Sequence, residues 1–304
     1  MLRSHALSTA LALASLGVFV CSPPGCGGSG SEALATGASL LEDVEDEEEH
    51  IWPLVYLAKG YTARGHKRMA TKFAGQAKEA CMTSDRGGYA STFLAPLLVV
   101  NGDLEGAQAL AAALGQRAEE DDSYAPYHVG TLNGIVQGLF QQRRYDEGLE
   151  VAKEALAAPL ALADAHLRHE VFTLVMDTFD EAHAAGDTDL AAKMLEFGTK
   201  YAPVYGGEGV LHNRAVALAE KGDTTTALLI IEGIRSDATQ MHGQLAIAKI
   251  MTEHGDLPSA EALFTAAMGS ALEAEENKLD IDMTGASQFM DQLASMQAEM
   301  DKQM

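Results

Sequence analysis

The chain has 304 residues and carries 44 acidic side chains against 21 Lys and Arg, which gives a formal net charge of -23. Proteins that bind nucleic acid or anionic membrane surfaces neutralise phosphates with lysine and arginine, so this balance argues against both partners. Hydrophobic residues make up 47% of the chain, enough for a sizeable core, and only 6% of the residues are aromatic. With heavy alanine use, this composition favours helices over strands.

The first 25 residues have the pattern of an export signal. Arg3 precedes the apolar stretch ALSTALALASLGVFV, and small and turn-forming residues follow it. This stretch has about the length of a signal-peptide apolar region, and it is too short to favour a membrane-spanning helix. We therefore expect an exported protein, located in the periplasm or on the outer surface.

Two kinds of processing fit the residues after the apolar stretch. The segment PPGCGGSG resembles a lipoprotein signal, in which Cys26 is lipidated and becomes the first residue of the mature chain. Pro23 departs from that pattern, which has an apolar residue three places before the cysteine. The alternative is cleavage by ordinary signal peptidase, for example after residues 33–35, which read Ala-Leu-Ala. A lipid on Cys26 is the single membrane attachment that the sequence suggests.

Residues 26–50 are expected to form a flexible linker. Gly and Ser follow Cys26, and the run LEDVEDEEEH at residues 41–50 stands directly before the repeat region. Blocks of like charge repel one another and stay solvated. We interpret this run as solvated linker, with weak binding of a divalent cation as the alternative.

Between residues 51 and 272, a turn residue recurs at intervals of 33 to 43 residues. The turn residues are Gly65, Gly102, Arg143, Gly186, Gly222 and Gly255. Five places after each stands a small residue, namely Ala70, Ala107, Gly148, Ala191, Ala227 and Ala260. Glycine ends a helix in the left-handed conformation, and an Asp or Thr after it accepts hydrogen bonds from the first amides of the next helix. The pattern predicts helix-turn-helix units that bury their apolar faces by stacking on one another.

Residue by residue, these units resemble tetratricopeptide repeats. The repeat's conserved large, small, aromatic, glycine and alanine places are occupied in the first unit by Leu54, Leu57, Ala58, Tyr61, Gly65, Ala70 and Ala77. In the sixth unit the matching residues are Ile247, Ala248, Met251, Gly255, Ala260, Phe264 and Ala267. Pro203 falls where that family ends a second helix, whereas Arg143 and Arg214 depart from the pattern. The resemblance implies an all-α fold, a right-handed α-solenoid of about six repeats.

Prolines mark several expected boundaries. Pro53 and Pro258 fall in first turns of helices, where a missing amide is harmless, and Pro126 and Pro159 fall between hairpins. Pro96 stands inside the apolar run TFLAPLLVV, where we expect it to kink or shorten the helix.

Residues 273–304 are expected to form capping helices. An apolar stripe at three- and four-residue spacing consists of Phe289, Met290, Leu293, Met296 and Met300. The open end of a solenoid needs a cover with a polar outer face. A helix that docks on a partner is the alternative.

Sequence motifs for chemistry are weak or missing. Residues 280–291 partly match an EF-hand calcium loop, but Ser287 and Asp291 depart from it. His166 and His169 share one helix face, yet two histidines rarely hold zinc alone. Cys81 reads as a small buried hydrophobe. Since there is no GxSxG, GxxxxGK or paired-cysteine motif, we expect no metal, no cofactor and no enzyme activity.

The expected function is therefore non-catalytic: a binding or scaffold protein whose concave groove takes a protein or peptide. In the family that the repeats resemble, inward-facing residues of the first helices contact the ligand. The corresponding residues here are Trp52, Lys59, Asn133, Gln137, Asp180, His183, His212 and Lys249. The alternative is an accessory domain or enzyme of the cell envelope with a small-molecule cleft. A buried Asp or Glu beside a buried His would favour that alternative.

Overall fold

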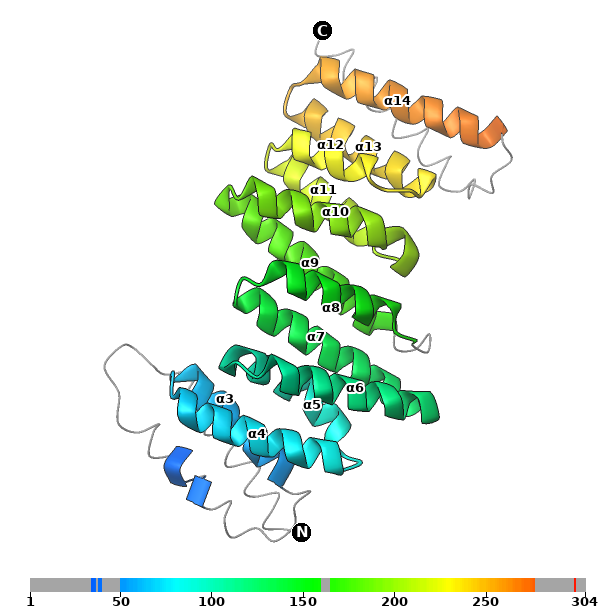
Figure 1. The fold of residues 1–304 in the computed structure, drawn as a ribbon. Helices are drawn as coiled ribbons and strands as arrows, with labels where there is room; N and C mark the ends of the chain where they lie inside the picture. The colour runs from blue at the N-terminus through cyan, green and yellow to red at the C-terminus, as the bar shows by residue number, and fades with distance from the viewer. Residues whose placement is uncertain (1–33, 37, 40–49, 160–164, 277–297, 299–304) are drawn as a thin grey trace. The chain divides into compact units, whose positions relative to one another are not determined.

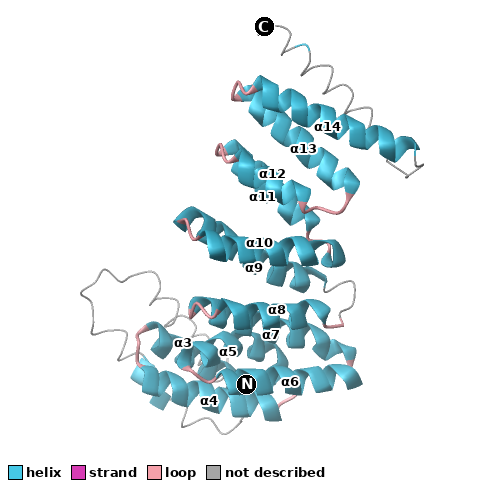
Figure 2. Ribbon diagram, turned by 45° about the horizontal axis from the view of Figure 1, so that its top comes forward, coloured by secondary structure: helices cyan, strands magenta, loops and turns pink. Residues whose placement is uncertain are grey.

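A computed structural model describes residues 34–36, 38–39, 50–159, 165–276 and 298 (Figure 1). The expected signal, Cys26, the acidic run before residue 50, the calcium-like segment and the apolar stripe near the C-terminus lie outside these residues. Throughout the described ranges the regular structure is helical, without a strand (Figure 2), which confirms the all-α prediction. None of the described helices has the length and apolar character that a membrane span requires.

Six helical hairpins follow one another in the described part of the chain (Figure 1). They are α3 (Ile51–Ala63) with α4 (Lys67–Thr83), α5 (Gly87–Asn101) with α6 (Leu104–Glu120), α7 (Ala125–Gln141) with α8 (Tyr145–Ala157), α9 (Ala165–Ala185) with α10 (Thr188–Tyr205), α11 (Glu208–Glu220) with α12 (Thr224–Glu232), and α13 (Asp237–Glu253) with α14 (Leu257–Glu276). A short 3-10 helix, η2 (Asp122–Tyr124), precedes α7. The prediction of about six helix-turn-helix repeats is confirmed.

The chain divides into two compact units, with the boundary between Leu174 and Val175 inside α9. Unit 1 contains the first three hairpins and the start of α9. Unit 2 contains the rest of α9, its partner helix α10 and the last two hairpins. Each unit is described by itself below.

The turns between paired helices form at the predicted residues. Gly65, Gly102, Gly186, Gly222 and Gly255 have φ angles of 71°, 96°, 74°, 90° and 85°. Arg143 has a φ of 59° at the equivalent turn, and it is the one non-glycine residue with positive φ among those described. A side chain with a Cβ is disfavoured in this region by about 1–2 kcal/mol. The turn of this hairpin therefore has the left-handed conformation even at Arg143, where the sequence has no glycine.

The aspartates after the turn glycines cap the second helices as predicted. Asp103 accepts a hydrogen bond from the Gly106 amide at 2.9 Å, and Asp223 accepts one from the Thr226 amide at 3.1 Å. Asp187 caps α10 in the same way. Such caps are worth about 1 kcal/mol each because they satisfy an amide that has no partner within the helix.

A glycine stripe on α7 brings that helix unusually close to α5. A Cβ at Gly134 would lie 2.7 Å from Pro96 Cδ and 2.9 Å from the Thr92 carbonyl oxygen. At Gly130 and Gly138, an added Cβ would lie 2.7 Å from side-chain atoms of α5. The two helices therefore pack with little between their backbones at these positions.

Two proline positions differ from expectation. Of the two effects expected of Pro96, a kink or a shortened helix, the shortening does not occur, because α5 continues to Asn101. Its ring lies against Gly134, where the missing side chain of α7 leaves room for it. Pro126 lies in the first turn of α7 instead of between hairpins, a position that tolerates the missing amide as well.

Cys81 lies in the core of unit 1, as predicted. Its side chain is only 2% exposed. Burial raises the pKa of the thiol to about 11, although a hydrogen bond with Ser91 opposes the shift. A thiol held neutral in this way is a poor nucleophile.

Candidate functional site

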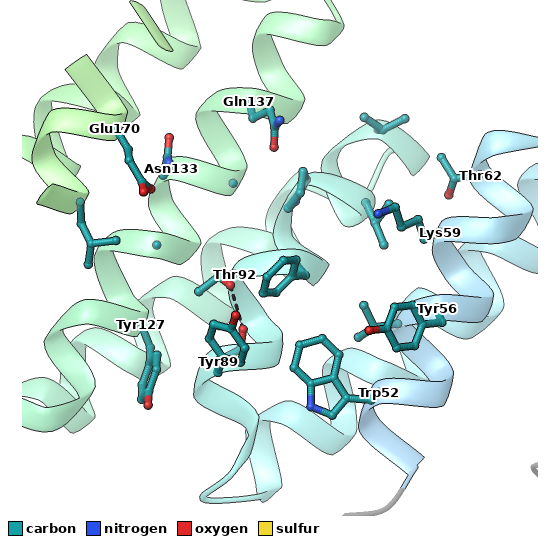
Figure 3. Close-up of a pocket in the computed structure, with 18 of the residues that line it drawn as sticks. Trp52, Tyr56, Lys59, Thr62, Tyr89, Thr92, Tyr127, Asn133, Gln137 and Glu170 are labelled. Carbon is teal, nitrogen blue, oxygen red and sulfur yellow. Dashed lines mark hydrogen bonds between the residues drawn. The ribbon is translucent and has the colours of Figure 1, made fainter. Parts of the chain in front are cut away.

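Unit 1 contains a cavity of about 1430 Å³ (Figure 3). Its walls come from α3, α5, α7, the start of α9 and Ser123 of η2, so every wall helix is the first helix of its hairpin. The second helices α4, α6 and α8 contribute no lining residue. The cavity is thus formed by the inner face of successive hairpins.

Polar contacts between first helices hold the cavity walls in place. Asn101 on α5 donates a hydrogen bond to the Thr62 hydroxyl of α3 at 2.7 Å. Gln142, directly after α7, donates to the Val99 carbonyl of α5 at 2.7 Å. Arg168 on α9 donates to the Ala158 carbonyl at the end of α8 at 2.6 Å. These contacts join the wall helices to their neighbours at their ends.

Five aromatic side chains line one side of the cavity, and we call them the aromatic wall: Trp52 and Tyr56 of α3, Tyr89 and Phe93 of α5, and Tyr127 of α7 (Figure 3). The Trp52 ring centroid lies 5.6 Å from those of both Tyr89 and Phe93, and Tyr89 lies 6.5 Å from Tyr127. Tyr89 remains 56% exposed and Phe93 remains 46% exposed. Aromatic surface left open in a concave site is typical of a place where a partner binds.

Amide side chains of α7 supply the polar part of the cavity. Asn133, Gln137 and Gln141 lie at successive turns of the helix and all line it. The Oδ1 atom of Asn133 is buried, and it receives no hydrogen bond from the described residues. A buried acceptor without a donor costs free energy, so this oxygen is a natural contact for a donor on a ligand.

The cavity has one cationic and one anionic side chain, on opposite sides. Lys59 of α3 and Glu170 of α9 are the only Lys, Arg, Asp or Glu among the lining residues. Figure 3 shows them across the cavity from each other, with the helix α5 between their helices. The formal charge of this lining is therefore balanced, in contrast to the net charge of -23 of the whole chain.

Four of the eight predicted contact residues line this cavity. Trp52 and Lys59 do so from α3, and Asn133 and Gln137 do so from α7. The structure brings the four together, while their role in binding a ligand stays a prediction.

Two of the other four, Asp180 and His183, contact neighbouring helices of unit 2. Asp180 accepts a hydrogen bond from Arg214 Nε at 2.9 Å, and Arg214 also pairs with Asp177. Arg214 itself is only 15% exposed. His183 Nε2 lies 2.7 Å from Asp223 Oδ2. Arg214 stands at a position that is apolar in the repeat family. Its guanidinium pairs there with two carboxylates of α9, the first helix of the preceding hairpin.

His212 and Lys249 are also in unit 2 and line no described cavity. His212 Nδ1 lies 3.3 Å from the side-chain oxygen of its neighbour Asn213. Lys249 is 67% exposed and its Nζ lies 3.9 Å from Glu253 Oε1 on the same helix. An exposed pair of this kind contributes little to stability.

The described residues contain no cluster typical of metal binding and no buried Asp or Glu beside a buried His. Among them, no three His, Cys, Asp or Glu side chains cluster as metal ligands do. The buried polar side chains of the described region are Ser, Thr and Asn, and no Asp, Glu or His is among them. His166 and His169 are both exposed on α9, and His166 lies at the edge of the cavity.

The residues of this site that sequence reasoning missed include Tyr56, Tyr89, Phe93, Tyr127, Gln141 and Glu170. Tyr89 and Phe93 are spaced four apart on a first helix, so they share one face. That spacing is equally typical of a core stripe, and only the packing of α5 on α7 shows that the two rings face open space.

The chain aligns with solved structures of Rap proteins. No family model matches the chain, and no curated protein matches it in sequence. Among solved structures, the apo form of RapI aligns at a TM-score of 0.36 and 11% identity, covering 81% of this chain and 92% of RapI. A Rap protein in complex with competence and sporulation factor aligns at 0.33 and 17% identity, covering 82% of this chain and 71% of that protein. Similarity at these TM-scores does not indicate a shared ligand.

Proposed function

We propose that this chain is a non-catalytic binding or scaffold protein, and that the cavity of unit 1 takes an extended segment of a protein or peptide. The observation that carries the proposal is the aromatic wall, which leaves Tyr89 and Phe93 about half exposed inside a concave site. Large aromatic side chains in such sites are the usual energetic centres of protein recognition.

The size of the cavity supports a peptide over a small molecule. Pockets for small ligands measure about 300–1,000 Å³. The cavity here is about 1430 Å³ and is lined along three helices by rings and amides. Rings provide contact area for an apolar side chain, and amides exchange hydrogen bonds with a peptide backbone.

The burial pattern supports a function without catalysis. Catalytic acids and bases gain their perturbed pKa values from burial or from close charged neighbours. In the cavity, Lys59, His166 and Glu170 are all exposed. An open site with exposed polar side chains favours binding over proton transfer.

Selection from a library of random 12-residue peptides tests the proposal. Peptides enriched on the wild-type protein are then measured by calorimetry against Phe93→Ala and against Leu229→Ala. Leu229 is 56% exposed in unit 2, so its variant removes exposed apolar surface elsewhere. We expect Phe93→Ala to weaken binding at least tenfold, or about 1.4 kcal/mol, and Leu229→Ala to leave it unchanged.

Two results would overturn this assignment. Enriched peptides that bind Phe93→Ala as tightly as wild type would place the binding surface elsewhere. A failure of the library to yield any binder, combined with enrichment of a small molecule that Phe93→Ala abolishes, would favour a small-molecule cleft instead.

We further propose that the protein is exported and acts at the cell envelope, either lipidated at Cys26 or freed by signal peptidase. The support is the sequence pattern of the first 26 residues. Mass spectrometry of the mature N-terminus separates the two routes: a diacylglyceryl-modified Cys26 indicates lipidation, and a free amine after residue 35 indicates cleavage. An intact Met1 on protein from a cell fraction without envelope would contradict export.

A further inference from the structure

We propose that the cavity of unit 1 selects a dipolar segment: one with an acidic residue at one end, an apolar residue in the middle and a basic residue at the other end. This inference rests on the proposed function, because it names the chemistry of the segment that the same cavity takes. The observation behind it is the placement of Lys59 and Glu170 on opposite sides of a lining that has no other Lys, Arg, Asp or Glu.

Lys59 supplies the cationic side of the cavity. It is exposed on α3 and lines the cavity. The other exposed cations of the first hairpin, Lys67, Arg68 and Lys72, lie on α4, which lines no part of the cavity. The charge of the site therefore differs from the net charge of -23 of the whole chain. Electrostatic attraction depends on nearby charge more than on the total, since salt screens charges beyond about 10 Å.

The Glu170 side has the opposite sign. Glu170 is exposed on α9 and lines the cavity. Arg168 on the same turn of α9 does not line the cavity, and its guanidinium donates to the Ala158 carbonyl. A basic end of the ligand would thus meet an unopposed carboxylate at the cavity surface.

The aromatic wall determines where the middle of the segment lies. Trp52 and Tyr56 lie on α3 together with Lys59, and the other three rings lie on α5 and α7, which precede the helix that carries Glu170. Apolar walls lower the local dielectric constant and strengthen the attraction of each charged end. Charge complementarity then adds selectivity to the binding that the rings provide.

Five synthetic peptides with blocked termini test the inference. All share a central Phe between short Ala spacers, and they differ only in their end residues: Asp with Lys, Lys with Asp, Asp with Asp, Lys with Lys, and Ser with Ser. Each is made with three spacer lengths. Blocked termini leave the end side chains as the sole charges. Binding is measured at pH 8 for every peptide, so that the charges of the end residues are the same throughout.

Charge-reversal variants provide the matched set. We expect wild type to bind a dipolar peptide at least threefold more tightly than either same-sign peptide. Lys59→Glu should turn this preference toward the Lys with Lys peptide, and Glu170→Lys should turn it toward the Asp with Asp peptide. The double variant, which exchanges the two signs, should restore the preference for a dipolar peptide. Both residues are exposed, and unchanged thermal unfolding confirms that each variant is folded.

The outcomes separate this inference from the proposed function. If all five peptides bind wild type equally and Phe93→Ala weakens them all, the proposed function stands and the dipolar selection is wrong. The inference would also be contradicted if the order of peptide affinities stayed the same in both Lys59→Glu and Glu170→Lys. If no peptide binds and the library of the previous section yields binders that ignore Phe93, both are wrong.

Discussion

The two units use equivalent inner-face positions of their first helices in different ways. In unit 1, Trp52, Lys59, Asn133 and Gln137 line one cavity. In unit 2, Asp180 pairs with Arg214, and His183 pairs with Asp223. The same position in the repeat therefore lines a cavity in unit 1 and contacts a neighbouring helix in unit 2.

The residue opposite each position decides between these uses. In unit 2, Arg214 supplies a cation from the next first helix, which takes up the carboxylates of α9. In unit 1, the facing positions of α5 and α7 hold aromatic rings, amides and glycines, and Gly134 lets the two helices pack closely. Rings and amides leave the inner face open, whereas a guanidinium pairs with it.

Close packing of α5 on α7 is the feature of unit 1 with the largest expected effect on stability. Gly134→Ala places a Cβ within 3.0 Å of Pro96 Cδ and of the Thr92 carbonyl. Overpacking of this kind costs about 1–3 kcal/mol. The matched control is Gly75→Ala in α4, where nothing lies within 4 Å of the added Cβ, and it should stabilise by about 0.5–1 kcal/mol. Urea unfolding measures both, and equal effects of the two variants would contradict the close packing.

The second prediction compares a cation of each unit. Arg214→Met in unit 2 removes the pairs with Asp177 and Asp180, and should cost about 1 kcal/mol because the carboxylates are partly exposed. Lys59→Met in unit 1 should change the free energy of unfolding by less than about 0.5 kcal/mol. Thermal unfolding checks both variants. A larger loss of stability for Lys59→Met than for Arg214→Met would contradict the view that the inner-face residues pair with a neighbouring helix in unit 2 and line a cavity in unit 1.

The third prediction concerns alkaline pH and unit 1. Burial raises the pKa of the Cys81 thiol from 9.0 to about 11, so the unfolded chain releases this proton first as the pH rises. The contribution of the thiol to stability is complete below pH 9 and is lost as the pH rises toward 11. The free energy of unfolding of wild type, relative to Cys81→Ala, should therefore fall over this interval. A difference that stays constant from pH 8 to 10.5 would rule out the buried neutral thiol.

The smallest predicted effect is at acid pH in unit 2. Burial acts to raise the pKa of Asp223, but hydrogen bonds from Thr226 and the contact with His183 outweigh it and lower the value below 3.8. The stability that Asp223 provides is thus present above that value and lost as the pH falls through the folded-state pKa. Relative to Asp223→Asn, which retains a capping side chain, wild type should lose stability between pH 5 and 3. If the difference in the free energy of unfolding between wild type and Asp223→Asn stays the same from pH 5 to pH 3, this contribution of Asp223 to stability is ruled out.

Much of the fold could be predicted because its signals are local. A turn residue at Gly65, Gly102, Arg143, Gly186, Gly222 or Gly255 needs only its own φ angle and the helices on either side. The capping aspartates likewise act within three residues of themselves, as Asp103 does on Gly106. Such short-range geometry can be read from one stretch of sequence.

The site was only half predictable because it depends on which residues face one another. Asp180 and Lys59 occupy similar repeat positions, yet only the identity of residue 214 makes Asp180 a helix contact. The four-residue spacing of Tyr89 and Phe93 is equally typical of a core stripe, and only the packing of α5 leaves the two rings about half exposed.

Trp52 gives the most direct test that the cavity of unit 1 is the binding surface, since it is the one tryptophan of the chain and lies in the aromatic wall. Its emission is titrated with a peptide selected on wild-type protein whose affinity is known from calorimetry. The account predicts that the emission shifts to shorter wavelength and saturates with the calorimetric dissociation constant, and that Phe93→Ala abolishes the shift. Full calorimetric binding without any change in Trp52 emission would contradict it.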